Sequence, residues 1–273
     1  MRKIKFDTCI VGTGKAGIDF SAKLAQKYNL PTEQKSVQIG CRFEAPQKYF
    51  QKLIDISYDF KLYQKHENVS LRSFCTNNNA AYVAVEETYG DVTYNGHAKK
   101  GEQFRNDMTN FGILMEIKGI EDPFKWSRDV VQKCQEGYIN LENEDIGKNI
   151  FEKAGIFYSP DSFRFPSNTS EGTEVKSVKT NDLDLFKESF GEYADYILNF
   201  IDQMNKVFEF GDDWGMYIPE VKYAAPEPLT NHSDLSLVEY SNVHFVGDAL
   251  SARGITVSGA HGIYVAESLI NLD

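Results

Sequence analysis

The chain has 273 residues, of which 41% are hydrophobic and 25% charged, as expected of a soluble globular protein with one large domain or two smaller ones. A formal net charge of −11 disfavours nucleic acid and anionic membranes as partners. We expect no signal peptide from the first residues, and no apolar run approaches the roughly 20 residues that cross a bilayer. The four cysteines, Cys9, Cys41, Cys75 and Cys134, form no CxxC pair, so we expect reduced thiols in a cytoplasmic protein and no metal site.

The first half of the chain predicts a strand–loop–helix unit and then a series of strands. Ile4–Val11 is apolar at most positions and predicts a buried strand. The glycine-containing stretch 12–17 follows it and leads into a helix from about Ile18 to Tyr28. Turn-prone Asn and Gly separate the later strands, which we predict at Ser36–Phe43, Phe60–Lys65, Val69–Cys75, Ala81–Thr88, Val92–Tyr94 and Gly112–Lys118.

The second half is more helical and closes with another strand–loop–helix unit. Asp122-Pro123 is typical of a helix start, here for a helix to about Glu136. The Ser-, Thr-, Pro- and Asn-rich stretch Ser159–Lys179 predicts a long loop. Other helices are predicted at Ile146–Ala154, Asp184–Phe190 and Tyr193–Phe208, and the last unit has a strand at 242–246, a loop at 249–253 and a helix at 254–270. Strand–loop–helix units at both ends around a β-rich insert suggest an interrupted dinucleotide-type α/β core.

The N-terminal Gly12-x-Gly14-x-x-Gly17 is a weak dinucleotide-binding signal. Such a fingerprint holds a pyrophosphate at a helix start and should be followed about 20 residues on by an acidic ribose ligand. Glu44 is the first acidic residue at the end of the next predicted strand, and it lies 27 positions beyond Gly17. An NAD(P)-binding protein that uses residues 12–17 is therefore the weakest of the three functional hypotheses that we consider.

The C-terminal unit carries the clearest chemical signal. A strand that ends in Gly247-Asp248, before a helix that opens on Gly254-Ile255-Thr256, offers free backbone N–H groups and a positive dipole end to a ligand. Such a helix start would stabilise the partial negative charge of an isoalloxazine ring. The Asp248 carboxylate could accept hydrogen bonds from ribityl hydroxyls, and small helix residues would let the backbone approach a cofactor. The alternative is an ordinary strand–turn–helix in which Asp248 is a cap.

The segment NVHFVGDALSARGITVSGAHGIYVAESL resembles the closing motif of two-dinucleotide-domain flavoproteins. That motif has an apolar strand, Gly-Asp, a short loop and a helix rich in small residues. The resemblance implies FAD as the cofactor. The residues that it places at the cofactor are Gly247, Asp248, Arg253, Gly254, Ile255 and Thr256.

The N-terminal part resembles a narrower group, the poorly characterised NAD(FAD)-utilising dehydrogenases. The resemblance rests on the segment VGTGKAGIDFSAKLAQKYNLPTEQKSVQIGCRFEAP. In it, Gly40, Arg42, Glu44 and Pro46 match the group's apolar–Gly–x–Arg–x–Glu–x–Pro pattern. The resemblance then covers nearly the whole chain, because the group's order continues through Ser73-Phe74-Cys75, Tyr94-Asn95-Gly96, Arg105-Asn106 and the C-terminal motif.

This resemblance implies a fold class and a division into domains. We expect a partial FAD/NAD(P)-binding-type α/β core, formed by residues 1–40 and 215–273, with an inserted β-rich α+β substrate or cap domain at 41–214. In the family these segments follow an N-terminal FAD-binding βαβ unit, which we expect this chain to lack. Gly12 and Gly14 then belong to the strand that returns to the FAD domain and not to the primary pyrophosphate loop. We still predict Gly12, Thr13 and Gly14 as cofactor-binding residues. The chain is expected to be a short form, one half of a split enzyme or a remnant.

Arg42 and Glu44 are weak candidates for catalysis. They alternate on one predicted strand and so share a face, where they could hold an anionic substrate over the flavin. The alternative is a surface or interdomain ion pair. The family's Cys-x-Cys-Pro-Gly-Gly-like stretch reads Cys75-Thr76-Asn77-Asn78-Asn79-Ala80 here, so we interpret Cys75 as structural.

Two classes of function follow. The first is an FAD-dependent oxidoreductase that acts on an unknown small-molecule substrate, with NAD(P)H as a possible electron donor. The second is a non-catalytic subunit or binding module that retains the flavoprotein fold. Either class predicts a homo- or hetero-oligomer, because a missing FAD-binding layer leaves sheet surface for a partner chain or a second copy to cover.

Overall fold

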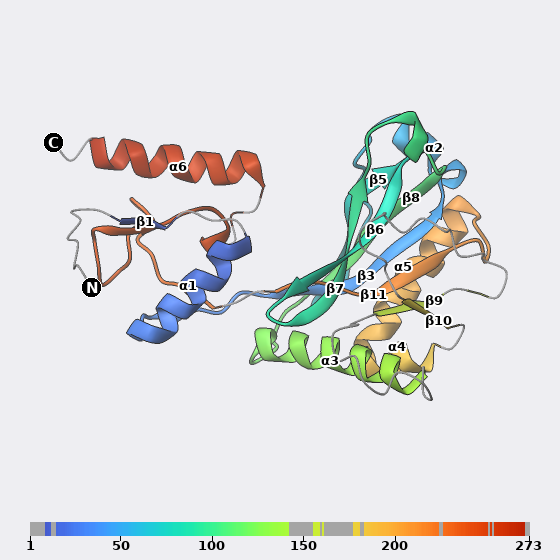
Figure 1. Ribbon diagram of the computed structural model, residues 1–273, viewed down its shortest axis with the longest axis horizontal. Helices are drawn as coiled ribbons and strands as arrows, with labels where there is room; N and C mark the ends of the chain where they lie inside the picture. The colour runs from blue at the N-terminus through green and yellow to red at the C-terminus, as the bar shows by residue number, and fades with distance from the viewer. Residues whose placement is uncertain are drawn as a thin grey trace. The chain divides into compact units, whose positions relative to one another are not determined.

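The chain folds into two compact units of mixed α and β structure (Figure 1). This computed structural model describes residues 9–11, 15–141, 155–158, 160, 177–180, 183–223, 226–250, 252 and 254–270. The first unit combines Met1–Lys35 with Ala224–Asp273, and the second is Ser36–Tyr223. These limits differ from the expected 40/41 and 214/215, because β3 (Val37–Pro46) runs through 40/41 and pairs with β11 (Gly215–Lys222) inside the second unit.

The first unit is built on two parallel strands from opposite ends of the chain. Strand β1 (Cys9–Val11) pairs with β13 (Val243–Phe245) in the register Cys9↔Val243 to Val11↔Phe245. Helix α1 (Lys15–Tyr28) follows β1, and the turn η4 (Gly247–Leu250) and helix α6 (Ile255–Ile270) follow β13. A short antiparallel pair joins β2 (Thr32–Glu33) to β12 (Glu227–Pro228). The apolar core of this unit consists of Leu237, Phe245 and Ala249, with Leu24, Leu30, Val243 and Leu250 packed against it.

The second unit contains a seven-stranded, mostly antiparallel sheet. Its strand order is β10 (Ser177–Thr180), β9 (Gly155–Tyr158), β11, β3, β8 (Met108–Ile117), β5 (Val69–Asn78) and β4 (Tyr63–Lys65). The central pair β3–β8 keeps an unbroken register from Val37↔Ile117 to Pro46↔Met108. Because side chains alternate along a strand, the two faces of this sheet have different chemistry.

One face of the large sheet is apolar and is covered by helices. Ile39, Cys41 and Phe43 of β3 belong to a buried cluster that also takes side chains from α3 (Pro123–Leu141), α4 (Asp184–Phe190) and α5 (Ala194–Phe208). Phe43 lies at its centre, with the rings of Phe50, Phe111, Phe210 and Trp214 at centroid distances of 5.2 to 6.2 Å. The shorter helical turns are η1 (Gln47–Tyr49), α2 (Gln51–Ile54), η2 (Glu102–Phe104) and η3 (Gly191–Tyr193).

The opposite face is covered by the hairpin of β6 (Ala81–Thr88) and β7 (Asp91–Ala98), which pair from Ala81↔Ala98 to Thr88↔Asp91. A small apolar cluster joins the hairpin to the sheet. The buried carboxylate of Asp91 links the hairpin to α3, because it accepts hydrogen bonds from Arg128 Nε and Tyr223 Oη, each at 2.8 Å. Gly40, Arg42 and Glu44 of β3 alternate with its apolar residues and so face this layer.

The sequence-based element predictions succeed where the local pattern is strong. The strands at 69–75, 81–88 and 112–118 and the helices at 184–190 and 193–208 are confirmed, and the predicted short strand 92–94 is longer, at 91–98. Strands β9 and β11 were missed, and β10 begins inside the predicted loop. The predicted helix 146–154 lies outside the described residues. None of the helices in the described ranges is long and apolar enough to span a membrane.

Gly40→Ala is expected to destabilise the second unit by about 1–3 kcal/mol, because an added Cβ would overlap the backbone carbonyl of Ile113 and force β3 away from β8. Urea unfolding followed by tryptophan fluorescence measures the loss. Gln38→Ala, two residues away on the same face of β3, is the matched control and should cost much less. Equal losses in the two variants would contradict the steric argument.

Candidate functional site

The paired ends of β1 and β13 define the first candidate site. The pairing is parallel, so both strands end at the same edge, and the sequence continues from Val11 into residues 12–14 and from Phe245 into Val246 and Gly247. In α/β proteins, ligands bind beyond the carboxyl ends of such strands. Four of the predicted cofactor residues, Gly12, Thr13, Gly14 and Arg253, lie outside the described residues. The other five are Gly247, Asp248, Gly254, Ile255 and Thr256.

The turn η4 is held by the helix that follows it. Gly247 has φ 68°, a conformation that favours glycine, and its N–H donates to His261 Nδ1 at 3.4 Å. This contact supports a structural role for His261. Asp248 is half-buried in the same turn.

Helix α6 begins with exposed donors. Gly254, at φ 93°, accepts the first helical hydrogen bond from Ser258 N at 2.9 Å, and Ser258 Oγ donates to Ala252 O at 2.8 Å. Ile255 is 95% exposed and Thr256 is also exposed. Helix geometry leaves the first N–H groups of α6 without intrahelical acceptors. These groups can bind a partly negative ring edge.

The surface of α6 is apolar and largely open to solvent. Val265 is its one buried residue, whereas Ile255, Val257, Ile263, Tyr264 and Ile270 are all exposed. A Cβ added at Gly259 or Gly262 would meet no atom within 4 Å. A flat ring could therefore approach the helix at these two glycines, and the described residues offer a flavin open N–H groups and the half-buried carboxylate of Asp248.

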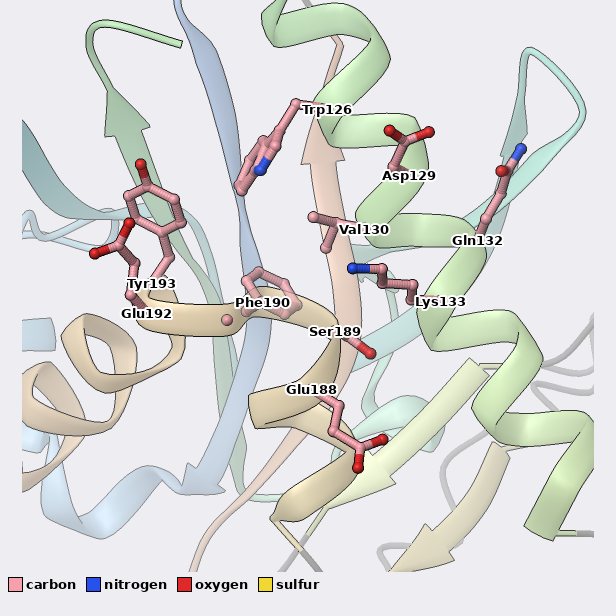
Figure 2. Close-up of a pocket in the computed structure, with 11 residues that line it drawn as sticks. Trp126, Asp129, Val130, Gln132, Lys133, Glu188, Ser189, Phe190, Glu192 and Tyr193 are labelled. Atoms are coloured by element: carbon pink, nitrogen blue, oxygen red, sulfur yellow. The ribbon is translucent and has the colours of Figure 1, made fainter.

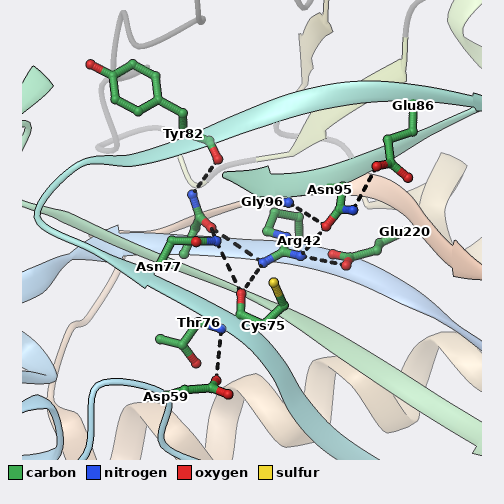
Figure 3. Close-up of polar contacts among 11 residues, drawn as sticks. Arg42, Asp59, Cys75, Thr76, Asn77, Tyr82, Glu86, Asn95, Gly96 and Glu220 are labelled. Carbon is green, nitrogen blue, oxygen red and sulfur yellow. Dashed lines mark hydrogen bonds and ion pairs between the residues drawn. The ribbon is translucent and has the colours of Figure 1, made fainter. Parts of the chain in front are cut away.

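The second candidate site is a buried polar network around Arg42 in the second unit (Figure 3). Arg42 is fully buried, and its Nη2 contacts Glu220 Oε1 at 2.6 Å and Asn95 Oδ1 at 3.1 Å. Its Nη1 donates to the Cys75 carbonyl at 2.8 Å and to Asn110 Oδ1 at 3.4 Å. Hydrogen bonds to a charged donor are stronger than those between neutral groups. The guanidinium thus joins strands β3, β5, β7, β8 and β11.

Local irregularities of the strands present these acceptors to Arg42. The β5–β8 register shifts between Phe74 and Asn77, and Cys75, at φ 50° within this bulge, turns its carbonyl toward Arg42. Thr76 N donates instead to the Asp59 carboxylate at 3.1 Å.

Two glycines keep the network compact. A Cβ on Gly112 would lie 2.8 Å from Glu220 Oε2, and a Cβ on Gly96 would lie 2.5 Å from Arg42 Nη1. The sheet and the hairpin can approach each other around Arg42 only because both positions lack a side chain.

Glu44 lies on the same face of β3 but forms no ion pair with Arg42 among the described residues. It is 2% exposed, and its Oε1 has no hydrogen-bond partner there. Burial raises the pKa of the Glu44 carboxyl to about 8, and the Asn110 hydrogen bond and the Arg42 charge only partly oppose this. The shift therefore favours the protonated form of Glu44 at neutral pH.

These contacts change the interpretation of the two catalytic candidates. Arg42 and Glu44 share a face, as the alternation predicts, but the partner of Arg42 is Glu220 within its own unit. The alternative prediction, a surface or interdomain ion pair, was wrong. Neither side chain is exposed enough to touch a substrate. The sequence reading missed Glu220 and Asn110. Asn95-Gly96 and Cys75, which the family resemblance had marked, do converge on Arg42.

Comparison with models of known protein families yields no match, and no curated protein is significantly similar to the chain. The family resemblance of the motifs therefore stays a prediction. Within the described ranges, no three His, Cys, Asp or Glu side chains gather as a metal site would require.

Proposed function

We propose that the chain is an FAD-dependent oxidoreductase of the dehydrogenase type, or one part of a split enzyme of that type. The observation that carries this proposal is the parallel pairing of β1 with β13. It brings the N-terminal and C-terminal strand–loop–helix units, 232 residues apart at Val11 and Val243, to one sheet edge. This supports the proposal, because dinucleotide cofactors bind beyond the carboxyl ends of parallel strands.

Each part of the cofactor has a proposed binding residue. The first N–H groups of α6, from Ile255 and Thr256, are proposed to face the pyrimidine edge of the ring, and Asp248 is proposed to accept hydrogen bonds from the ribityl chain. Residues 12–14 and Arg253 would complete the site, as the resemblance implies. A bound flavin would supply hydride or electron transfer between a donor such as NAD(P)H and a small-molecule substrate. The second unit is proposed to act as the substrate or cap domain.

We expect the purified protein to show flavin absorption, either as isolated or after incubation with FAD, and to lose it on reduction. Asp248→Ala should weaken FAD binding about tenfold, because a carboxylate acceptor is lost. Glu267→Ala, an exposed carboxylate further along α6, is the matched control and should bind FAD as the unchanged protein does. A colourless protein that takes up no added FAD would contradict an intact flavin site in this chain.

A non-catalytic subunit is the second candidate, and the exposed apolar surface of α6 favours it. Short parallel strands are normally covered on both faces, so β1, β13 and α6 together favour a further layer of protein. We propose that a partner chain carrying an FAD-binding unit, or a second copy, supplies it. Cytoplasmic localisation is part of the same proposal.

If a second copy supplies this layer, light scattering of the purified protein should report a dimer or larger assembly. If a partner chain supplies it, the purified protein should be a monomer that associates once that partner is added. Ile263→Lys would place a charge on the exposed face of α6 and should weaken the assembly. Lys187→Glu in the other unit is the control. A monomer that is stable at low concentration and binds FAD unaided would contradict the need for a partner while leaving the flavin proposal intact.

A further inference from the structure

A groove of about 510 Å³ opens between helix α3 and the segment formed by α4 and η3 (Figure 2). This volume falls in the range of small-molecule sites. Its lining includes Trp126, Val130, Lys133, Phe190 and Tyr193. The helices that form it cover the apolar face of the large sheet, whereas the Arg42 network lies on the other face, so the groove is a separate feature.

The inner surface of the groove is aromatic. Val130 and Phe190 are 3% and 2% exposed and form its floor. Trp126 and Tyr193 are half-buried and meet edge to face, with ring centroids 5.3 Å apart and planes at 80°. Aromatic faces of this kind gain by covering a further ring, through apolar burial and offset or edge-to-face contacts.

One cation is directed into this space. Lys133 is exposed and forms no hydrogen bond or ion pair with the described part of the chain. In Figure 2 its ammonium points toward Val130, Phe190 and Ser189, whereas the carboxylates of Asp129 and Glu188 point away from it. Asp129 is already paired with Lys125, at 2.5 Å. The charge that faces the floor of the groove is therefore positive.

From this geometry we propose that the groove binds a small aromatic carboxylate. The ring of the ligand lies over Val130 and Phe190 beside the Trp126–Tyr193 pair, and its carboxylate pairs with Lys133. Glu188 and Glu192 on the rim oppose a larger anionic group, which restricts the ligand to a single acidic function near Lys133. This site does not depend on the flavin proposal.

Titration with three probes of similar size tests the proposal: phenylacetate, phenylacetamide and 2-phenylethylamine carry a negative, zero and positive charge. Trp126 and Trp214 are the two tryptophans, so saturable quenching that disappears in Trp126→Phe reports the groove. We expect phenylacetate to bind about threefold or more tightly than phenylacetamide.

The variants decide the role of the cation. Lys133→Met should abolish the preference for the acid, so that phenylacetate and phenylacetamide bind alike. Lys187→Met, at an exposed lysine on α4 outside the groove, should keep the preference. Circular dichroism confirms that each variant is folded. Equal affinity for acid and amide, tighter binding of the amine, or no saturable quenching with any probe would overturn the proposal.

Discussion

Arg42→Met is expected to destabilise the second unit by about 3–5 kcal/mol, the cost of leaving one member of a buried ion pair alone. Without the guanidinium, the buried Glu220 carboxylate loses its partner at 2.6 Å. The Cys75 carbonyl and Asn95 Oδ1 lose a charged donor at the same time. Methionine fills part of the space but offers no hydrogen, so Glu220 Oε1 is left without its donor in the interior. The Cys75 carbonyl keeps a weaker hydrogen bond from Asn77 Nδ2 at 3.2 Å, and Asn95 Oδ1 keeps one from Gly96 N at 2.8 Å.

Urea unfolding monitored by the fluorescence of buried Trp214 measures this loss. Arg72→Met is the matched control, since Arg72 is exposed on β5 and lies over the ring of Phe74. The double variant Arg42→Met, Glu220→Met should recover part of the loss, because no charge is then buried alone. A single-variant loss below about 1 kcal/mol would show that the network contributes little.

The sequence allowed the local elements of the fold to be predicted. Alternating apolar residues in Val69–Cys75 and Ala81–Thr88 identify strands, and the helices at 184–190 and 193–208 follow from their own spacing. Strand β11 was missed because Pro219 lies within it, and proline normally argues against a strand interior. Here a register shift between Tyr217 and Glu220 accommodates the proline.

The network itself could not be predicted, because it depends on distant pairings. Arg42 and Glu220 are 178 residues apart, and the strand register that joins them is not visible in either segment alone. The bulge at Cys75 likewise appears only when β5 is paired with β8. Alternation showed that Arg42 and Glu44 share a face but could not show that the β6–β7 hairpin covers that face.

The two units therefore differ in what they contribute to the functional proposal. In the second unit, the residues that the family resemblance marked, Arg42, Cys75 and Asn95-Gly96, hold the sheet and the hairpin together. In the first unit, Gly247 is buried, Asp248 is half-buried and Gly254 lies at an exposed helix start. Our proposal therefore places the cofactor at the first unit, since buried and mutually bonded groups cannot reach a ligand.

Glu44→Gln is expected to stabilise the second unit at pH 8 and above and to flatten its pH dependence. The pKa of Glu44 is about 8 in the folded protein and 4.5 for a solvated glutamate, so the folded state binds this proton more tightly. The Glu44 contribution is then complete below pH 4.5 and is lost as the pH rises through 8, at up to about 1.4 kcal/mol per pH unit. Glutamine stays neutral throughout and avoids this loss.

The groups that face Glu44 set the controls for this measurement. Arg42 and Asn110 favour the ionised carboxylate, and burial of Tyr217 raises its pKa, so the phenol stays neutral beside Glu44. Burial also raises the pKa of Glu220, which adds to the pH dependence in the same direction and remains in the Glu44→Gln variant.

Urea unfolding at pH 5, 6.5 and 8 should show the free energies of unfolding of the variant and the unchanged protein diverging as the pH rises. Glu121→Gln, exposed in the loop after β8, should follow the unchanged protein. The contrary outcome is a plot of unfolding free energy against pH for Glu44→Gln that runs parallel to that of the unchanged protein. Glu44 would then be ionised in the interior and held by Arg42. Arg42 would be the shared counter-ion of two buried carboxylates, Glu44 and Glu220.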